Sequence, residues 1–344
     1  MSKWLDRRQR VLRAGLLGGV CLLAALPAVG ADETFDPGTH PAIARWVDAQ
    51  VASGADRGWL EKALKQAAYR QGVLEAMSKA PERHLRWDEY RDIFIQPERI
   101  QAGADFVRAH RDAFARARDT YGVAPEVIAA IIGVETYYGR HAGSHRVLDS
   151  LATLAFHHPS RGEFFRGELA AFLTITREQG VDPGSLEGSY AGAMGYPQFI
   201  PTSYQAYAVD FDDDGKRDLW HDPVDAIGSV GNYFARHGWQ AGAPIVAEAT
   251  GPATPPDAIA FNRTQPPYER VDALAAAGVQ AEDSSLAADR QVIPLALDVA
   301  DGKTRYRLGF RNFYVITRYN HSHLYAMAVA TLAERIREAL EAPA

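Results

Sequence analysis

The sequence predicts a mainly α protein of the α+β class, in which a small β-rich insert interrupts the helical part. Helix-like spacing of apolar residues runs through most of residues 41–117, and four stronger helical segments follow between residues 121 and 239. Pro and Gly are frequent in residues 240–308, where short strand-like runs appear. A final helical segment covers about residues 325–340.

These patterns predict four parts of the chain. Residues 1–30 form a targeting segment, residues 31–117 an N-terminal helical domain, residues 118–239 with 309–344 a helical core, and residues 240–308 the insert. With 344 residues, 47% of them hydrophobic and 23% charged, the chain is long enough to bury a sizeable core.

The targeting segment has the pattern of a secretory signal peptide. A basic stretch precedes an apolar run over residues 14–26, and small residues suited to cleavage follow at 28–31. A membrane anchor is the alternative, although the apolar run is short for a span. Cys21 is a candidate lipidation site, but Val20 before it is bulkier than such sites prefer. We therefore expect export to the periplasm, and favour an outer-membrane lipoprotein less.

Charge and cysteine content exclude several classes of function. Without the five basic residues and one acidic residue of the first thirty, 32 basic and 42 acidic residues remain, a formal charge of −10. Such a chain has no overall attraction to nucleic acid or anionic lipid, and a neutral polysaccharide is a more natural partner. Cys21 is the only cysteine, so cleavage near Ala31 would leave a chain with no disulfide, thiol nucleophile or cysteine-bound metal.

One predicted helix carries a carboxyl group on its apolar side. Pro125 suits its first turn and Gly139 its end. The spacing of Ile128, Ile132 and Glu135 places Glu135 on the apolar stripe, close to the C-terminus of the helix. Partial burial and the negative end of the helix dipole both disfavour the ionised carboxyl, so we expect a raised pKa. A general acid that works near neutral pH needs this property.

A structural role for Glu135, in an ion pair with Arg140 or Arg161, is the alternative. Motifs of other enzyme classes are missing from the sequence: it has no GxSxG, no HExxH, no phosphate-binding loop and no dinucleotide fingerprint.

Four sequence blocks resemble one known family. Residues 133–139, GVETYYG, are similar to the catalytic motif of the membrane-bound lytic transglycosylase B family. Residues 188–201 (GSYAGAMGYPQFIP), 222–234 (DPVDAIGSVGNYF) and 312–327 (NFYVITRYNHSHLYAM) follow in the family's order. The resemblance implies a lysozyme-like catalytic core and an enzyme that acts on peptidoglycan.

The chemistry implied by the resemblance needs one carboxyl group. Glu135 would protonate the β-1,4 bond between N-acetylmuramic acid and N-acetylglucosamine, and then, as a base, help to close a 1,6-anhydro ring on the muramic acid. The implied enzyme is a lyase that acts on a polysaccharide, consumes no water and needs no organic cofactor. We expect a monomer whose partner is the glycan strand, not nucleic acid. Proteins of wall synthesis or division are further candidate partners that the sequence does not identify.

The same resemblance implies a set of substrate contacts. Tyrosines suit a glycan cleft because they offer a ring face and a hydroxyl together. The family often has two adjacent arginines where this chain has Ser160 and Arg161, so one contact is missing. We expect Ser160 to open a capping box with Glu163 instead. The implied contacts are Tyr90, Arg161, Ser189, Gln198, Tyr233, Tyr319, Asn320 and Tyr325.

Residues 210–218 match the first nine positions of an EF-hand calcium loop. Acids occupy positions one, three, five and nine, and glycine occupies position six. This pattern predicts a structural calcium ion held by Asp210, Asp212 and Asp214, with Lys216 at the seventh position, where the backbone carbonyl binds. An acidic turn without metal is the alternative.

The end of the loop departs from the motif. His221 stands at the twelfth position, where glutamate is expected. The last carboxylate must come from further along, as in the family, and Asp222 and Asp225 are both candidates. Asp222 could instead serve only as the N-cap of the helix that begins at Pro223.

Two other functions compete with lytic transglycosylation. A hydrolase of lysozyme type would need a second acid or a positioned water, and Asp149 or Glu163 could be proposed as the acid. A wall-binding module without activity would not need a carboxyl group on an apolar stripe, so Glu135 disfavours it.

Overall fold

A computed structural model describes two stretches of the chain, residues 34–78 and residues 85–342. The predicted signal peptide, with the anchor and lipidation alternatives, lies outside the described residues. The chain folds into two compact units: the described residues up to 78 with residues 141–206, and residues 85–140 with residues 207–342. Within the described residues, none of the helices has both the length and the apolar character needed to cross a membrane.

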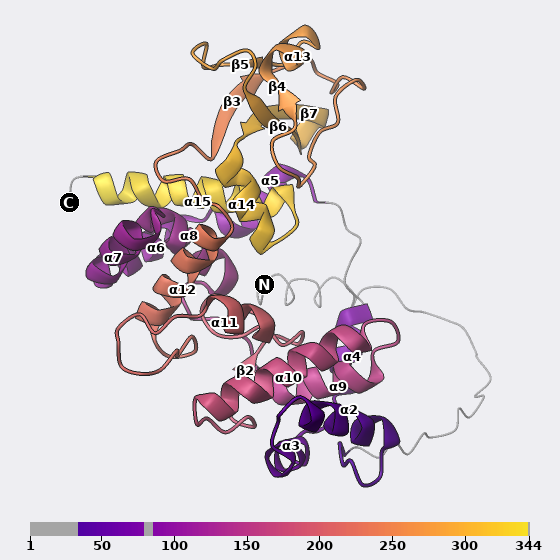
Figure 1. The fold of residues 1–344 in the computed structure, drawn as a ribbon. Coiled ribbons are helices and arrows are strands. Elements are labelled where there is room, and N and C mark those ends of the chain that lie inside the picture. The colour runs from indigo at the N-terminus through magenta and orange to yellow at the C-terminus, as the bar shows by residue number, and fades with distance from the viewer. Residues whose placement is uncertain (1–33, 79–84, 343–344) are drawn as a thin grey trace, which may run out of the picture. The chain divides into compact units, whose positions relative to one another are not determined.

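The first unit is built around α9 (Val147–His157), nine of whose residues are buried. α10 (Gly162–Glu178) packs along it. A two-residue antiparallel pairing joins β1 (His145–Arg146) to β2 (Glu187–Gly188). The other helices of this unit are α2 (Pro41–Ala52), α3 (Arg57–Leu64), α4 (Gln71–Ser78) and α11 (Pro201–Tyr207) (Figure 1).

The second unit is built around α8 (Pro125–Thr136). Nine of its twelve residues are buried, which is typical of a helix that is apolar on all sides and lies inside a core. α6 (Pro97–Ala109) and α15 (His323–Glu341) both pack against it. The other helices around this core are α5 (Trp87–Phe94), α7 (Arg111–Tyr121), α12 (Pro223–Arg236) and α14 (Arg311–Tyr319) (Figure 1).

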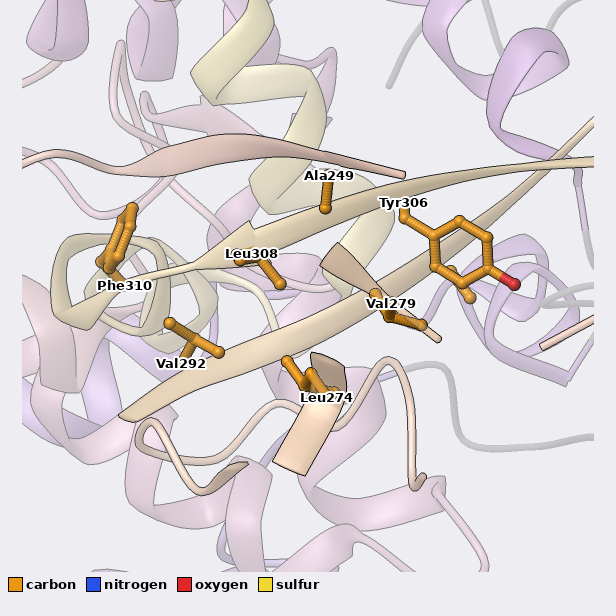
Figure 2. Close-up of a cluster of buried hydrophobic side chains, with 8 residues drawn as sticks. Ala249, Leu274, Val279, Val292, Tyr306, Leu308 and Phe310 are labelled. Carbon is orange, nitrogen blue, oxygen red and sulfur yellow. The ribbon is translucent and has the colours of Figure 1, made fainter. Parts of the chain in front are cut away.

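An antiparallel sheet of five strands, in the order β4-β6-β7-β3-β5, belongs to the second unit. β6 and β7 run side by side over seven paired residues, and β6 also contacts α5. Figure 2 shows the apolar cluster on one face of the sheet, where Ala249, Tyr306 and Leu308 belong to one buried group with Leu274. The elements are β3 (Val246–Thr250), β4 (Glu269–Arg270), α13 (Val271–Ala276), β5 (Gln280–Ala281), β6 (Gln291–Val299), the 3-10 turn η1 (Ala300–Gly302) and β7 (Lys303–Gly309).

The mainly α prediction with a small β-rich insert agrees with this architecture. Helices cover most of residues 41–117, and the strands of the sheet lie between residues 246 and 309. Five helices, not four, lie between residues 121 and 239; the additional one is α11, with seven residues. The compact units group residues 85–117 with α8, not with residues 34–78. The predicted domain limits stay a prediction.

Candidate active site

The helix that carries Glu135 ends in an unusual turn. α8 begins at Pro125 as predicted, but it ends at Thr136, three residues before the expected stop. Tyr137, Tyr138 and Gly139 all adopt left-handed backbone conformations, with φ of 53°, 59° and 84°. For a tyrosine this conformation costs about 1 kcal/mol, so contacts around the turn must hold it.

Tyr138 supplies part of that hold. Its hydroxyl donates to the backbone carbonyl of Arg99 at 2.9 Å. A Cβ atom on Gly103 or on Gly133 would lie only 2.4 Å or 2.6 Å from the same hydroxyl oxygen. The two glycines therefore leave a slot, one on α6 and one on α8, that the Tyr138 side chain fills.

Glu135 is half-buried, one residue before the end of α8. Burial raises the pKa of its carboxyl above the ordinary value of 4.5, and a hydrogen bond from Tyr325 partly opposes that rise. The Tyr325 hydroxyl donates to Oε1 of Glu135 at 2.6 Å. Tyr325 lies in the first turn of α15, where its backbone N–H donates to the N-cap Ser322 at 3.3 Å. The result is a carboxyl group that keeps its proton to higher pH and is held by one neutral donor.

Two further tyrosines lie close enough to Glu135 for its charge to affect their pKa. Burial raises the pKa of Tyr90, on α5, and of Tyr319, at the end of α14, and the Glu135 carboxylate adds to both increases. Both side chains are half-buried. The structure thus brings Tyr90, Tyr319 and Tyr325 from three separate helices to one carboxyl group.

Tyr233 and Asn320 have different surroundings. The Tyr233 hydroxyl donates to the carbonyl of Arg318 at 2.7 Å, and its ring stacks on His237 at 4.0 Å. The ring centre also lies 4.8 Å from that of Tyr319. The Tyr233 ring therefore packs against Tyr319, while its hydroxyl is hydrogen-bonded to the Arg318 carbonyl. Asn320 is exposed at the C-cap of α14.

Ser189 and Gln198 belong to the first unit, where both shape the loop after β2. The Ser189 hydroxyl accepts backbone N–H groups of Ala191 and Ala193 at 3.2 Å and 3.0 Å. Gln198 has a left-handed backbone (φ 52°), and its Nε2 donates to the carbonyls of Ala142 and Gly195. Both side chains hold the Gly/Ala-rich turn, an arrangement that the sequence did not predict.

The predicted capping box at Ser160 is wrong. α10 begins at Gly162, its N-cap is Arg161, and no side chain caps it. The imidazole Nδ1 of His158 instead accepts the backbone N–H groups of Ser160 and Arg161, at 3.2 Å and 3.0 Å. A ring nitrogen two to three residues back thus takes the place of the predicted hydroxyl. Arg161 itself is exposed, with its guanidinium 4.9 Å from the ring centre of Phe164.

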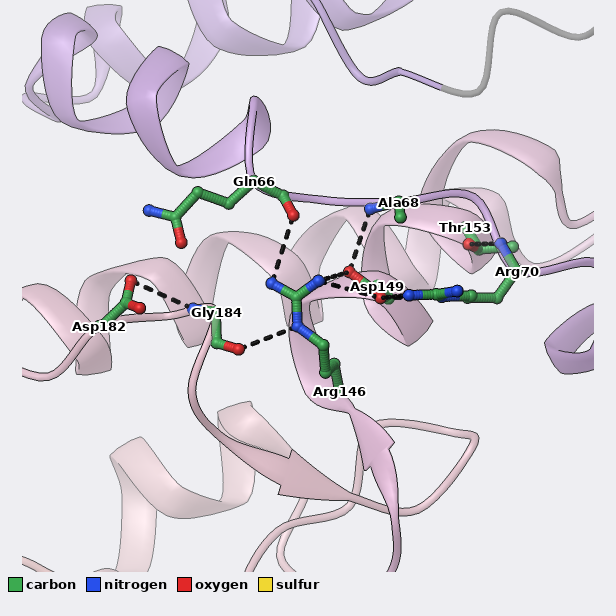
Figure 3. A network of polar contacts seen from close by, with 8 residues as sticks. All are labelled: Gln66, Ala68, Arg70, Arg146, Asp149, Thr153, Asp182 and Gly184. Carbon is green, nitrogen blue, oxygen red and sulfur yellow. Dashed lines mark hydrogen bonds and ion pairs between the residues drawn. The ribbon is translucent and has the colours of Figure 1, made fainter.

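Asp149, a candidate second acid, is fully engaged (Figure 3). Its side chain is 2% exposed and accepts the backbone N–H of Ala68 at 3.0 Å and Nε of Arg70 at 2.9 Å. Nη1 of Arg146 lies 3.1 Å from Oδ1. Arg146 also donates to the carbonyls of Gly184 and Gln66, so the carboxylate joins three chain segments. Two cations and a backbone donor leave Asp149 in a structural role.

The Transglycosylase SLT domain model matches residues 38–334. The chain belongs to this family. As a member of the Transglycosylase SLT domain family, it is a lytic transglycosylase that acts on peptidoglycan, and the activity and family predicted from the four motifs are confirmed.

A named relative and two solved structures agree with this assignment. "Membrane-bound lytic murein transglycosylase B" of Escherichia coli (strain K12) is 44% identical over 313 residues, which are 88% of this chain and 84% of that protein. The solved E. coli lytic transglycosylase Slt35 in complex with calcium is 44% identical, with a TM-score of 0.80 over 88% of this chain and 94% of that one. SltB3 of Pseudomonas aeruginosa in complex with NAG-anhNAM-pentapeptide is 32% identical, with a TM-score of 0.75 over 89% and 80%. These matches confirm the predicted fold class with its lysozyme-like core.

The loop predicted to bind calcium brings its acidic side chains together. Carboxylate oxygens of Asp210, Asp212 and Asp214 lie within 4.8 Å of one another. Asp212 forms a second such group with Asp222 and Asp225. The two groups share Asp212, and hard oxygen ligands of this kind suit calcium.

Both candidates for the last ligand belong to the second acidic group. Asp225 is buried, and its two oxygens accept the backbone N–H groups of Phe211 at 2.6 Å and Asp218 at 2.7 Å. Burial raises the pKa of Asp225 to about 6. Asp222 caps α12 by accepting the N–H of Val224 at 2.6 Å, so the N-cap role and a place in the acidic group coexist. His221 points to Asp218, 3.0 Å away.

Two residues that support the loop were missed in the sequence. The Ser229 hydroxyl accepts the N–H of Val209 at 3.0 Å, and Asn232 donates to the carbonyl of Tyr207 at 2.9 Å. With Asp225 they form a polar stripe at helical spacing on α12. That periodicity was visible in the block DPVDAIGSVGNYF and could have identified them.

Proposed function

We propose that Glu135 is the single catalytic carboxyl group of this lytic transglycosylase. It cleaves the β-1,4 bond between N-acetylmuramic acid and N-acetylglucosamine and leaves 1,6-anhydromuramic ends. The observation that carries the proposal is a half-buried carboxyl whose hydrogen bond comes from a tyrosine hydroxyl and not from a cation, and burial raises its pKa. A group held in this way can release its proton and recover it.

The reaction has two steps on one group. Protonated Glu135 gives its proton to the glycosidic oxygen as the C1–O bond of the muramic residue breaks, and the N-acetyl carbonyl of that residue stabilises C1. The Glu135 carboxylate, with the Tyr325 hydroxyl on Oε1, then takes the proton of the muramic C6 hydroxyl as O6 bonds to C1. The proton returns to Glu135 and no water enters. The SltB3 relative was solved in complex with an anhydromuramic ligand, in line with this product.

Further contacts to the glycan are part of the proposal. Tyr90, Tyr319 and Tyr325 offer rings and hydroxyls beside Glu135, with Tyr233 supporting Tyr319. Asn320, Arg161, Ser189 and Gln198 are assigned to the same role on the family resemblance. The proposed setting is the periplasm, and the proposed partner of the monomer is the glycan strand.

Product analysis tests the proposed chemistry. We expect a digest of purified wall in oxygen-18 water to give muropeptides with anhydro ends and no solvent oxygen, measured by mass spectrometry. A parallel digest with a hydrolytic lysozyme serves as the control and should give labelled reducing ends. Mostly labelled ends from this enzyme would contradict the single-carboxyl mechanism and favour hydrolysis.

We also propose that the acidic loop binds a calcium ion that stabilises the fold. Asp210, Asp212, Asp214, Asp222 and Asp225 would hold it, with the backbone carbonyl of Lys216. The ion would neutralise carboxylates that otherwise repel one another. The E. coli Slt35 relative was solved in complex with calcium, which supports this assignment.

Thermal unfolding tests the calcium site. Calcium should raise the melting temperature of the wild-type protein, because an ion bound only by the folded state stabilises it. Asp214→Ala should abolish the rise. Asp213→Asn is the matched control, since Asp213 lies in the same loop with φ of 64° but belongs to neither acidic group, and it should keep the rise. A wild-type protein without any calcium-dependent shift would remove the metal proposal.

A further inference from the structure

Arg99 on α6 contacts the end of the helix that carries Glu135. Its Nη1 donates to the carbonyl oxygen of Gly133 at 2.6 Å, and the same oxygen accepts the N–H of Tyr137 at 3.1 Å. The guanidinium lies 4.8 Å from the ring centre of Tyr137 and 5.4 Å from that of Phe94. Gly133 precedes Glu135 by two residues, so Arg99 acts on the last turn of the helix.

The setting of Arg99 is unfavourable for a charge. Burial penalises the cation and lowers the pKa of the guanidinium. Among the described residues Arg99 has no ion pair with an acidic side chain, and its Nε is buried without a hydrogen-bond partner. What it meets instead is the negative end of the α8 dipole. A cation kept at such a cost points to a task other than stability.

A second bond runs in the opposite direction. Tyr138 donates to the backbone carbonyl of Arg99, and its ring fills the slot between Gly103 and Gly133. The side chain of Arg99 thus binds the helix, and the turn after the helix binds the backbone of Arg99. Together the two bonds fix where α8 ends and hold two tyrosines in the left-handed conformation.

We propose that Arg99 is a positioning residue for Glu135, whose cationic guanidinium fixes the last turn of α8 and so places the carboxyl group against Tyr325. The proposal rests on the proposed role of Glu135. Without the guanidinium, the Gly133 carbonyl and the strained turn can relax, and Glu135 moves relative to the glycosidic oxygen. Small displacements of a catalytic group cost far more in turnover than in binding.

Chemical rescue of Arg99→Ala tests the proposal. We expect kcat to fall by about 10- to 100-fold while KM stays within about twofold, as for a misplaced catalytic group. Guanidinium chloride at about 20 mM, far below denaturing concentrations, should restore much of kcat by entering the vacated site. Urea, which is planar and similar in size but uncharged, should not. Arg108→Ala, which removes an exposed arginine from the same helix, should leave kcat unchanged.

Two further variants keep the test decisive if Arg99→Ala does not fold. Arg99→Lys keeps the charge without the planar fork and should show an intermediate loss of kcat at unchanged KM. Tyr138→Phe removes only the hydroxyl and should lower kcat by a few-fold, without response to guanidinium. Unchanged kcat in folded Arg99→Ala and Arg99→Lys, or equal rescue by urea, would overturn the proposal. Turnover by Glu135→Gln would instead overturn the proposed function itself, so the two failures are distinguishable.

Discussion

Glu135 and Asp149 are both shielded carboxyl groups on helices, yet their surroundings differ in every respect that decides reactivity. Asp149 meets two arginines and a backbone N–H, so its charge is fully matched. Glu135 is half-buried and meets one tyrosine hydroxyl, so its charge is poorly matched. A carboxyl group with cationic partners holds chain segments together, whereas one with a neutral partner can exchange its proton. Three substitutions test this contrast.

The largest expected effect is that of Glu135→Gln on turnover. The amide keeps the shape of the side chain but can act neither as acid nor as base, so kcat should fall by about 10³-fold or more. Release of muropeptides from wall measures the loss, and binding of the variant to wall is the control. Retention of more than about a tenth of the activity would refute the assignment.

The same variant should also be more stable than the wild type at neutral pH. Because folding raises the pKa of Glu135, its contribution to stability is complete below the ordinary value of 4.5 and is lost as pH rises through the folded pKa. Gln avoids that loss, so the melting temperatures of the two proteins should diverge as pH rises. Identical pH profiles would show that Glu135 is not desolvated.

Asp149→Asn should show the reverse pattern. Removing the charge leaves Arg70 and Arg146 without their partner, and we expect a loss of about 2 kcal/mol of unfolding free energy, because a buried, hydrogen-bonded carboxylate is lost while the two arginines stay partly exposed to solvent. Activity well below the melting temperature should stay close to wild type. Asp182→Asn, at an exposed aspartate in the same region, is the matched control. A large loss of kcat in folded Asp149→Asn would reopen the two-carboxylate mechanism.

The smallest effect is expected for Tyr325→Phe. The hydroxyl favours the ionised form of Glu135, so its removal should raise the pKa of Glu135 further. The limb of the pH–rate profile that falls as Glu135 ionises should then move to higher pH, with kcat lower by about tenfold because the base is less well held. Initial rates across a pH series measure both effects. A limb that moves to lower pH would contradict the assigned direction.

Parts of this site were predictable because they depend on local spacing. The apolar stripe through Ile128 and Ile132 is enough to place Glu135 in a desolvated position. The acidic alternation of residues 210–214 likewise identified the loop whose carboxylates converge. Such patterns need only the geometry of one helix or one turn.

Other features depend on contacts between distant segments and could not be predicted in this way. Tyr325 reaches Glu135 across 190 positions, and only the family motif indicated it. Arg70 reaches Asp149 across 79 positions, so the sequence left Asp149 open as a catalytic acid. The early end of α8 depends on the slot between two glycines, which no local signal encodes. The wrong prediction of a capping box at Ser160 has a local cause. The His158 imidazole accepts the backbone N–H groups of Ser160 and Arg161 there.

A buried amide helps to close the base of the β-rich insert. Asn312 is fully buried, and its side chain accepts the N–H of Gln240 and donates to the carbonyls of Gln240 and Ala243. The two ends of the insert therefore meet beside Asn312. The hydrogen bonds there help to offset the entropic cost of closing the long loop that the insert forms. Changes of length in the loops beyond Ala243 should therefore leave the register of α12 and α14 intact. The same junction is a place where a different module could be grafted, provided that the two ends of the module lie as close together as Ala243 and Asn312 do here.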